Sequence, residues 1–160
     1  MSHVLVPLAQ GCEELEAITI TDLLVRVGIT VTTCGLDENP VKASRGITII
    51  PDTCIDKVLN ESFDLIVLPG GLPGADHLRD NQSLQTIIKK QASENHYLAA
   101  ICAAPKALAE ACVLQGKKAT GFPGVLDALQ DNSITITNNA VEIDGNIITS
   151  RGPGTAMDFT

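Results

Sequence analysis

Short apolar segments alternate along this chain with segments whose apolar residues recur at helical spacing, and this alternation constrains the possible fold most strongly. Residues 4–8, 64–68 and 97–101 are almost entirely apolar, whereas residues 13–27 follow a helical pattern that ends at Gly28. Strands that are apolar throughout are typical of a parallel sheet with helices on both faces. The sequence therefore predicts a flavodoxin-like, doubly wound α/β sandwich with a mostly parallel sheet.

Further elements complete this pattern. A helix is expected over residues 83–94, with Ser83 as its N-cap, and another from Cys102 to about Val113. Ser44-Arg45-Gly46 is expected to turn a small hairpin. The remaining predicted strands are 30–34, 41–43, 48–50, 134–137, 141–143 and 147–150.

Composition narrows the class of protein. A chain of 160 residues suits one domain, and a hydrophobic content of 44% excludes intrinsic disorder. The net charge of −8 and an aromatic content of 2% argue against tight nucleic-acid binding. No apolar run reaches the roughly 18 residues of a membrane span, and the N-terminal residues lack the pattern of a signal peptide. We therefore expect a cytoplasmic protein without a nucleic-acid or membrane partner.

The cysteine pattern indicates free thiols. The number of cysteines is odd, no pair has CxxC spacing, and the histidines are far apart in sequence, so no zinc site is expected. The five thiols are Cys12, Cys34, Cys54, Cys102 and Cys112.

Cys102 is the strongest candidate nucleophile, because ligands of open α/β sheets bind beyond the carboxyl ends of the strands. Residues 100–104 read Ala-Ile-Cys-Ala-Ala, the small-x-nucleophile-x-small pattern of a strand-to-helix elbow. Pro105 suits the first turn of the following helix. A thiol at the positive end of a helix is expected to have a pKa lowered to about 3.5–7.5. The alternative is a small buried cysteine that only packs.

Glu16 and the glycine loop supply candidate partners for the thiol. Glu13 and Glu14 are interpreted as first-turn carboxylates that complement the helix dipole. Glu16 lies on another part of the helix surface, where a buried carboxyl can stay protonated beside a thiolate or move a proton. Gly70 and Gly71 can aim a backbone N–H at an oxyanion, although a plain tight turn is the alternative.

Other candidates are weaker. Cys12 lies near the same sheet edge and is a second candidate thiol, whereas His77 is interpreted as a surface residue. The remaining cysteines are expected to pack. The chain has no P-loop motif, and Met157 stands where a dinucleotide-binding GxGxxG needs its third glycine.

Five motifs together resemble the ThiJ/PfpI family of the class I glutamine amidotransferase-like superfamily, and most closely its Parkinson disease protein 7 and YajL branch. They are residues 11–17 (GCEELEA), 68–71 (LPGG), 99–105 (AAICAAP), 120–123 (TGFP) and 149–155 (TSRGPGT). The resemblance extends from His3 to Thr160.

The resemblance implies a homodimer with a flavodoxin-like fold and no metal or organic cofactor. It implies that Cys102 is an oxidisable nucleophile, that Glu16 is the protonated glutamate beside it, and that the amides of Gly71 and Ala103 form an oxyanion site. It also suggests Arg26 and Arg45 as supporting residues near the active-site and dimer region, and Gly70 of the glycine loop is a third supporting residue.

The chain departs from the family pattern at two positions. Phe122 stands where some members carry a histidine near the cysteine, and Ala103 stands where protease-like members carry one, which argues against a peptidase. The family also continues past Thr160 into a C-terminal helical segment. We therefore expect a single domain over residues 1–160 that lacks this segment.

Three functions are compatible with these residues. The leading hypothesis is a cofactor-free glyoxalase or deglycase that acts on methylglyoxal, glyoxal or their protein or nucleotide adducts through a Cys102 hemithioacetal and proton transfer by Glu16. The alternative is a redox-sensing, chaperone-like stress protein in which Cys102 is oxidised to sulfinate. A weaker alternative is a role in thiamine thiazole monophosphate biosynthesis, for which only the glycine loop offers support.

Overall fold

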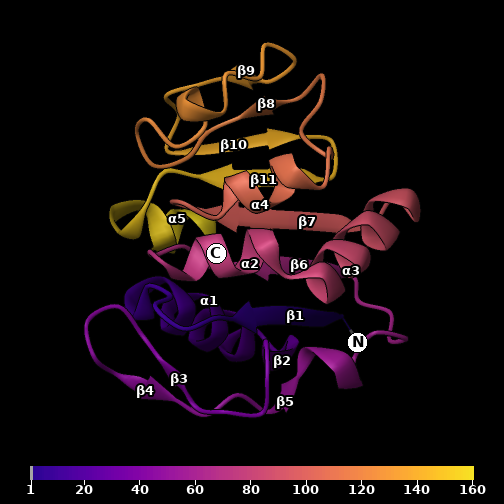
Figure 1. Ribbon diagram of the computed structural model, residues 1–160, viewed down its shortest axis with the longest axis vertical. Helices are drawn as coiled ribbons and strands as arrows, with labels where there is room; N and C mark the ends of the chain where they lie inside the picture. Colours follow the sequence, from indigo (N-terminus) through magenta and orange to yellow (C-terminus); the bar gives the residue numbers. More distant parts are fainter. Residues whose placement is uncertain (1) are drawn as a thin grey trace.

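The central sheet confirms the predicted mostly parallel α/β fold. The structure is a computed structural model that describes residues 2–160, within which seven strands pair in the order β10-β11-β7-β6-β1-β2-β5 (Figure 1). Only the β10–β11 pair is antiparallel in this sheet. Its strands are β1 (His3–Leu8), β2 (Thr30–Gly35), β5 (Thr53–Cys54), β6 (Leu65–Leu68), β7 (Tyr97–Ile101), β10 (Val141–Asp144) and β11 (Ile147–Ser150).

Helices cover both faces of this sheet. One face carries α1 (Glu14–Arg26) and α5 (Ala156–Phe159). The other carries α2 (Gly74–Asp80), α3 (Gln82–Ser93) and α4 (Pro105–Glu110).

Residues 4–8 of strand β1 are apolar because they are buried on both faces of the sheet. Val4 and Val6 pack in the core beneath α1, whereas Leu5 packs in the core beneath α3. Successive side chains of a strand point to opposite faces, so both cores require apolar residues here.

Smaller elements complete the chain. The predicted hairpin is confirmed by the antiparallel pairing of β3 (Val41–Lys42) with β4 (Thr48–Ile49). The other short elements are η1 (Ile55–Lys57), β8 (Lys118–Ala119), η2 (Asp127–Leu129), β9 (Thr135–Ile136) and η3 (Pro153–Thr155). No helix within residues 2–160 is long and apolar enough to cross a membrane.

Two helix boundaries differ from the prediction. The side chain of Asn81, not Ser83, caps α3 by accepting a hydrogen bond from the Leu84 N–H at 2.8 Å. The helix after Cys102 ends at Glu110 instead of near Val113, because Cys112 adopts a left-handed conformation with φ of 61°.

Candidate active site

Cys102 occupies a sharp turn between β7 and α4. Its φ of 62° is uncommon for a residue other than glycine, and this strained conformation is what the elbow pattern predicts. The Cys102 N–H donates to the Ser150 carbonyl at 2.9 Å, and the Cys102 carbonyl accepts from the Phe122 N–H at 2.7 Å. These bonds fix the residue from two other segments of the chain.

Gly70 leaves the space in which the thiol and Glu16 meet. A Cβ atom at this position would lie 2.6 Å from the Cys102 Cβ and 2.8 Å from Oε2 of Glu16. The Gly70 N–H donates to the same Oε2 at 2.7 Å. The glycine loop is therefore part of the packing of the site and not only a tight turn.

Two backbone amides converge on the Cys102 sulfur. The backbone N–H groups of Gly71 and Ala103 face the Cys102 sulfur, and both lower the pKa of its thiol. Gly71 has a φ of 87°, and a Cβ there would lie 2.3 Å from the backbone nitrogen of Glu13. This pair of donors has the arrangement of an oxyanion hole.

Glu16 is fully buried beside the thiol. Burial raises its pKa from an ordinary 4.5 to about 7, although the Gly70 N–H and the Cys102 thiol act in the opposite direction. Its second oxygen, Oε1, has no partner of normal hydrogen-bond geometry among residues 2–160. A carboxyl group in this setting can hold a proton near neutral pH and exchange it with a group bound at the sulfur.

The expectation of a lowered thiol pKa is wrong for the protein in this state. Burial, followed by the charge of Glu16, raises the pKa of Cys102 to about 12. Moreover, α4 has only six residues, so the dipole at its start is small. Since ionised Glu16 opposes the thiolate, the thiolate forms most readily when Glu16 holds the proton.

The neighbouring carboxylates have structural roles. Glu14 is buried and accepts hydrogen bonds from Ser44 Oγ at 3.1 Å and from the Arg45 N–H at 2.8 Å. Burial would raise the pKa of Glu14, but these and other hydrogen bonds hold it below its ordinary value. The interpretation of Glu14 as a carboxylate that complements the helix dipole is therefore incomplete, because Glu14 also anchors the β3–β4 turn to α1.

Cys12 is buried in the same core cluster as Cys102, whereas His77 is exposed. Burial and the charge of Glu14 raise the pKa of the buried Cys12 thiol to about 11. His77 is exposed and lines a separate open cavity of about 380 Å³ with Asp37 and Asp80, as a surface residue would.

Both supporting arginines have exposed side chains. Arg26 is exposed at the end of α1, where its Nε donates to Asp22 Oδ2 at 2.6 Å. It is ten residues from Glu16 on the same helix, which corresponds to about 15 Å. Arg45 is exposed on the hairpin turn, and its backbone rather than its side chain contacts Glu14.

Comparisons with known proteins decide the family. The chain matches the DJ-1/PfpI family over residues 2–160. The chain belongs to the DJ-1/PfpI family.

Several DJ-1/PfpI relatives cover most of the chain. Protein dj-1beta of Drosophila melanogaster is 44% identical over 156 residues, which are 97% of this chain and 83% of that protein. Protein DJ-1 homolog A of Arabidopsis thaliana is 44% identical over 159 residues, which are 98% of this chain but 41% of that protein. The glutathione-independent glyoxalase DJR-1.2 of Caenorhabditis elegans is 34% identical over 150 residues, which are 94% of this chain and 80% of that protein.

Solved DJ-1 structures share the fold. The crystal structure of Drosophila melanogaster DJ-1beta matches with a TM-score of 0.95 at 43% identity, covering 99% of this chain and 87% of that one. Oxidised Toxoplasma gondii DJ-1 matches with a TM-score of 0.94 at 37% identity, covering 99% and 86%. The predicted family resemblance and fold are therefore confirmed.

Two further residues of this DJ-1/PfpI chain, Gly152 and Phe122, lie beside the thiol and were given no site role from the sequence. A Cβ on Gly152 would lie 4.0 Å from the Cys102 sulfur and 3.5 Å from the half-exposed ring of Phe122. Both residues belong to the recognised motifs, but their convergence over the sulfur depends on tertiary structure. Among residues 2–160, no group of three or more side chains is arranged to hold a metal ion.

Proposed function

We propose that this DJ-1/PfpI chain is a cofactor-free glyoxalase or deglycase that acts on methylglyoxal, glyoxal or their adducts on protein or nucleotide groups. The observation that carries the proposal is the meeting of one thiol, one buried protonatable carboxyl and two backbone N–H groups at Cys102. A relative at 34% identity that is named a glyoxalase adds support. No second reactant besides water is required.

The first step forms a carbon–sulfur bond. Glu16 as carboxylate takes the thiol proton while the sulfur attacks the aldehyde carbon, and the carbonyl electron pair moves to oxygen. The N–H groups of Gly71 and Ala103 stabilise this oxyanion. Glu16 then returns its proton to the oxygen, giving a hemithioacetal on Cys102.

The second step moves a proton between adjacent carbons. Glu16 removes the proton from the former aldehyde carbon, forming an enediolate, and delivers it to the neighbouring carbon, while the hydroxyl proton of the first carbon passes to the oxygen of the second. The first carbon is oxidised and the second is reduced, so no external oxidant is needed. Water then hydrolyses the resulting Cys102 thioester to a 2-hydroxy acid and the free thiol. A pKa of about 7 allows Glu16 to alternate between acid and base.

Methylglyoxal turnover tests the proposal directly. Lactate formation is measured for the wild type, Cys102→Ala and Glu16→Gln, with Cys112→Ala as a control because Cys112 is an exposed thiol. We expect lactate from the wild type and the control, and a loss of at least about a hundredfold in the two site variants. Full activity of Cys102→Ala or Glu16→Gln would refute the mechanism.

A redox sensor is the second candidate function. The two N–H donors that would hold an oxyanion can also hold the oxygens of a Cys102 sulfinate, and an oxidised DJ-1 from Toxoplasma gondii shares the fold. Peptide mass spectrometry after mild peroxide treatment distinguishes this role. Selective oxidation of Cys102 would support it, whereas oxidation spread over all five thiols would count against it.

The resemblance also supports a homodimer, which we propose on the exposed apolar side chains of α1 and the β3–β4 hairpin. These side chains are Leu15, Ile18, Val25, Ile47 and Ile50. Light scattering coupled to size-exclusion chromatography is expected to give the mass of two chains, and the mass of one chain would exclude the dimer.

A further inference from the structure

Each of the two N–H donors at Cys102 belongs to a loop that leads directly into a short helix. Gly71 lies just before α2, and its carbonyl accepts from the Ala75 N–H of the first turn at 2.8 Å. Ala103 lies just before α4, which begins with Pro105. The separation of the two donors therefore depends on how α2 and α4 are held against each other.

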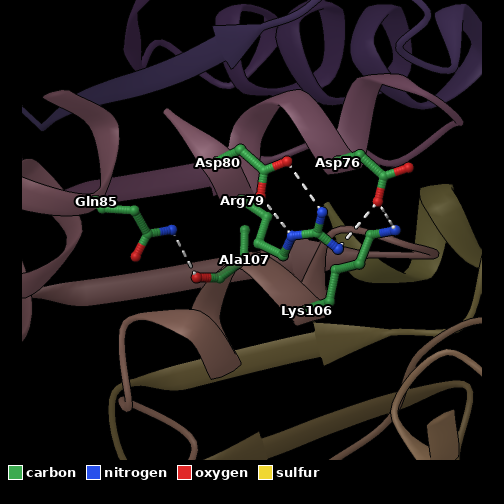
Figure 2. Close-up of polar contacts among 6 residues, drawn as sticks. All are labelled: Asp76, Arg79, Asp80, Gln85, Lys106 and Ala107. Atoms are coloured by element: carbon green, nitrogen blue, oxygen red, sulfur yellow. Dashed lines mark hydrogen bonds and ion pairs between the residues drawn. The ribbon is translucent and has the colours of Figure 1, made fainter. Parts of the chain in front are cut away.

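An ion-pair network joins these two helices near the donors (Figure 2). Lys106 Nζ of α4 contacts Asp76 Oδ1 of α2 at 2.5 Å, and an Arg79 guanidinium nitrogen contacts the same oxygen at 3.3 Å. Asp80 accepts two hydrogen bonds from Arg79, at 2.7 and 3.0 Å. Lys106 is three residues after Ala103 and Asp76 is five residues after Gly71, so the network lies close to both loops.

The Lys106–Asp76 pair differs from an ordinary surface ion pair. The Lys106 side chain is only 12% exposed, whereas the side chains of the surface pair Lys57–Glu38 are 64% and 76% exposed. Removing one partner should therefore cost more than it does for exposed pairs.

A second contact, a hydrogen bond, joins α3 to α4. The buried Gln85 side chain donates to the Ala107 carbonyl at 3.1 Å, one residue after Lys106 (Figure 2). The first turn of α4 is thus tied to both neighbouring helices. The ion pair of Lys106 with Asp76 connects this turn to α2, the helix that follows Gly71.

We propose that Lys106 and Asp76 are positioning residues that fix the separation of the Gly71 and Ala103 N–H groups around the Cys102 sulfur. Neither residue touches the sulfur, so their effect is transmitted through the two loops. For turnover, this inference rests on the proposed function. The predicted effect on the reactivity of the Cys102 thiol does not rest on the proposed function, because the same N–H donors stabilise a thiolate.

The test compares Lys106→Met, Lys106→Arg and Lys57→Met. Lys57→Met is the matched control. Lys57 is an exposed lysine of η1, and its Nζ pairs with Glu38 Oε1 at 2.8 Å. Cys102 alkylation by iodoacetamide is measured across pH by peptide mass spectrometry, together with thermal melting. The kcat and KM for methylglyoxal are then determined.

Lys106→Met is expected to slow Cys102 alkylation at pH 7 on the order of tenfold and to displace its pH profile to higher pH by about one unit. Lys106→Arg should restore the rate to within about threefold, because it restores the charge-assisted contact to Asp76. Lys57→Met should behave as the wild type. In turnover, kcat should fall in Lys106→Met while KM changes little.

A Lys106→Met protein with the wild-type rate and pH profile would overturn the inference, as would an equal loss in Lys57→Met. If Lys106→Met is unfolded at the assay temperature, Asp76→Asn, which keeps the side-chain shape, is measured against the same predictions. Alkylation needs no turnover. A failure of the proposed function, seen as no lactate even from the wild type, is therefore distinguishable from a failure of this inference.

Discussion

Replacing Glu16 by Gln should change how the stability of the protein depends on pH. The native pKa of Glu16 is about 7 and its ordinary value is 4.5, so between these values the folded state binds a proton that the unfolded state has released. The free energy of unfolding contributed by this group therefore falls as pH rises from 4.5 to 7 and is constant above 7. Glutamine has a similar shape and cannot titrate, so Glu16→Gln should remove this component.

The size of the effect follows from the shift. A difference of one pKa unit corresponds to 1.36 kcal/mol, so Glu16 should lower the free energy of unfolding by about 3 kcal/mol across this interval. The difference between wild type and Glu16→Gln should thus move by about 3 kcal/mol in favour of the variant. Full burial of the side chain means that solvent screening does not reduce this figure appreciably.

Urea denaturation of both proteins at several pH values from 4 to about 8 measures this difference. Glu14→Gln is the matched control, since Glu14 is on the same helix and is buried, but its native pKa lies below the ordinary value. Its stabilising contribution is present above the ordinary pKa and is lost at lower pH, so its difference curve should be flat between 4.5 and 7. A flat curve for Glu16→Gln over the same interval would refute the reasoning.

Two further predictions concern the space around the sulfur. Gly70→Ala should lower the free energy of unfolding by about 1–3 kcal/mol and abolish turnover. The reason is that the new Cβ would lie 2.6 Å from the Cys102 Cβ and 2.8 Å from Oε2 of Glu16. A melting curve like that of the wild type would contradict this prediction. Gly152→Ala should fold normally, because its new Cβ would meet Phe122 at 3.5 Å and the sulfur at 4.0 Å, both ordinary contacts. Since this methyl group occupies space beside the Cys102 sulfur, kcat/KM should fall about tenfold further for methylglyoxal than for the smaller glyoxal. Equal losses of kcat/KM for the two substrates would show that Gly152 does not limit substrate size.

The overall architecture was predictable because its signals are local. The buried strands are apolar on both faces, and the helix after β1 repeats apolar residues at a spacing that places Glu16 on the same face as Ile20 and Leu24. All three are buried. The position of Cys102 after a strand and before Pro105 likewise indicated an elbow, which its left-handed conformation confirms.

Features that depend on tertiary packing could not be predicted in this way. The helix α2 begins with glycine, follows a Pro-Gly-rich loop and buries only a small side, formed by Gly74, Ala75 and Leu78. No helix was therefore predicted here, and packing against α4 stabilises the one that forms.

The electrostatics of the site depend on packing in the same way. The raised pKa of Cys102 results chiefly from burial, and the extent of burial cannot be predicted from the elbow motif. The contact of Lys106 with Asp76 joins residues 30 positions apart and has no local signature.

The central claim is that Cys102 bonds covalently to the substrate and that Glu16 then moves its proton. Rapid mixing of the protein with methylglyoxal, followed by acid quenching, intact-protein mass measurement and lactate analysis, tests both parts. The account predicts a transient adduct on Cys102 of the wild type that converts to lactate, slow adduct formation with little lactate from Glu16→Gln, and neither product from Cys102→Ala. Lactate produced by Cys102→Ala at the wild-type rate would contradict it.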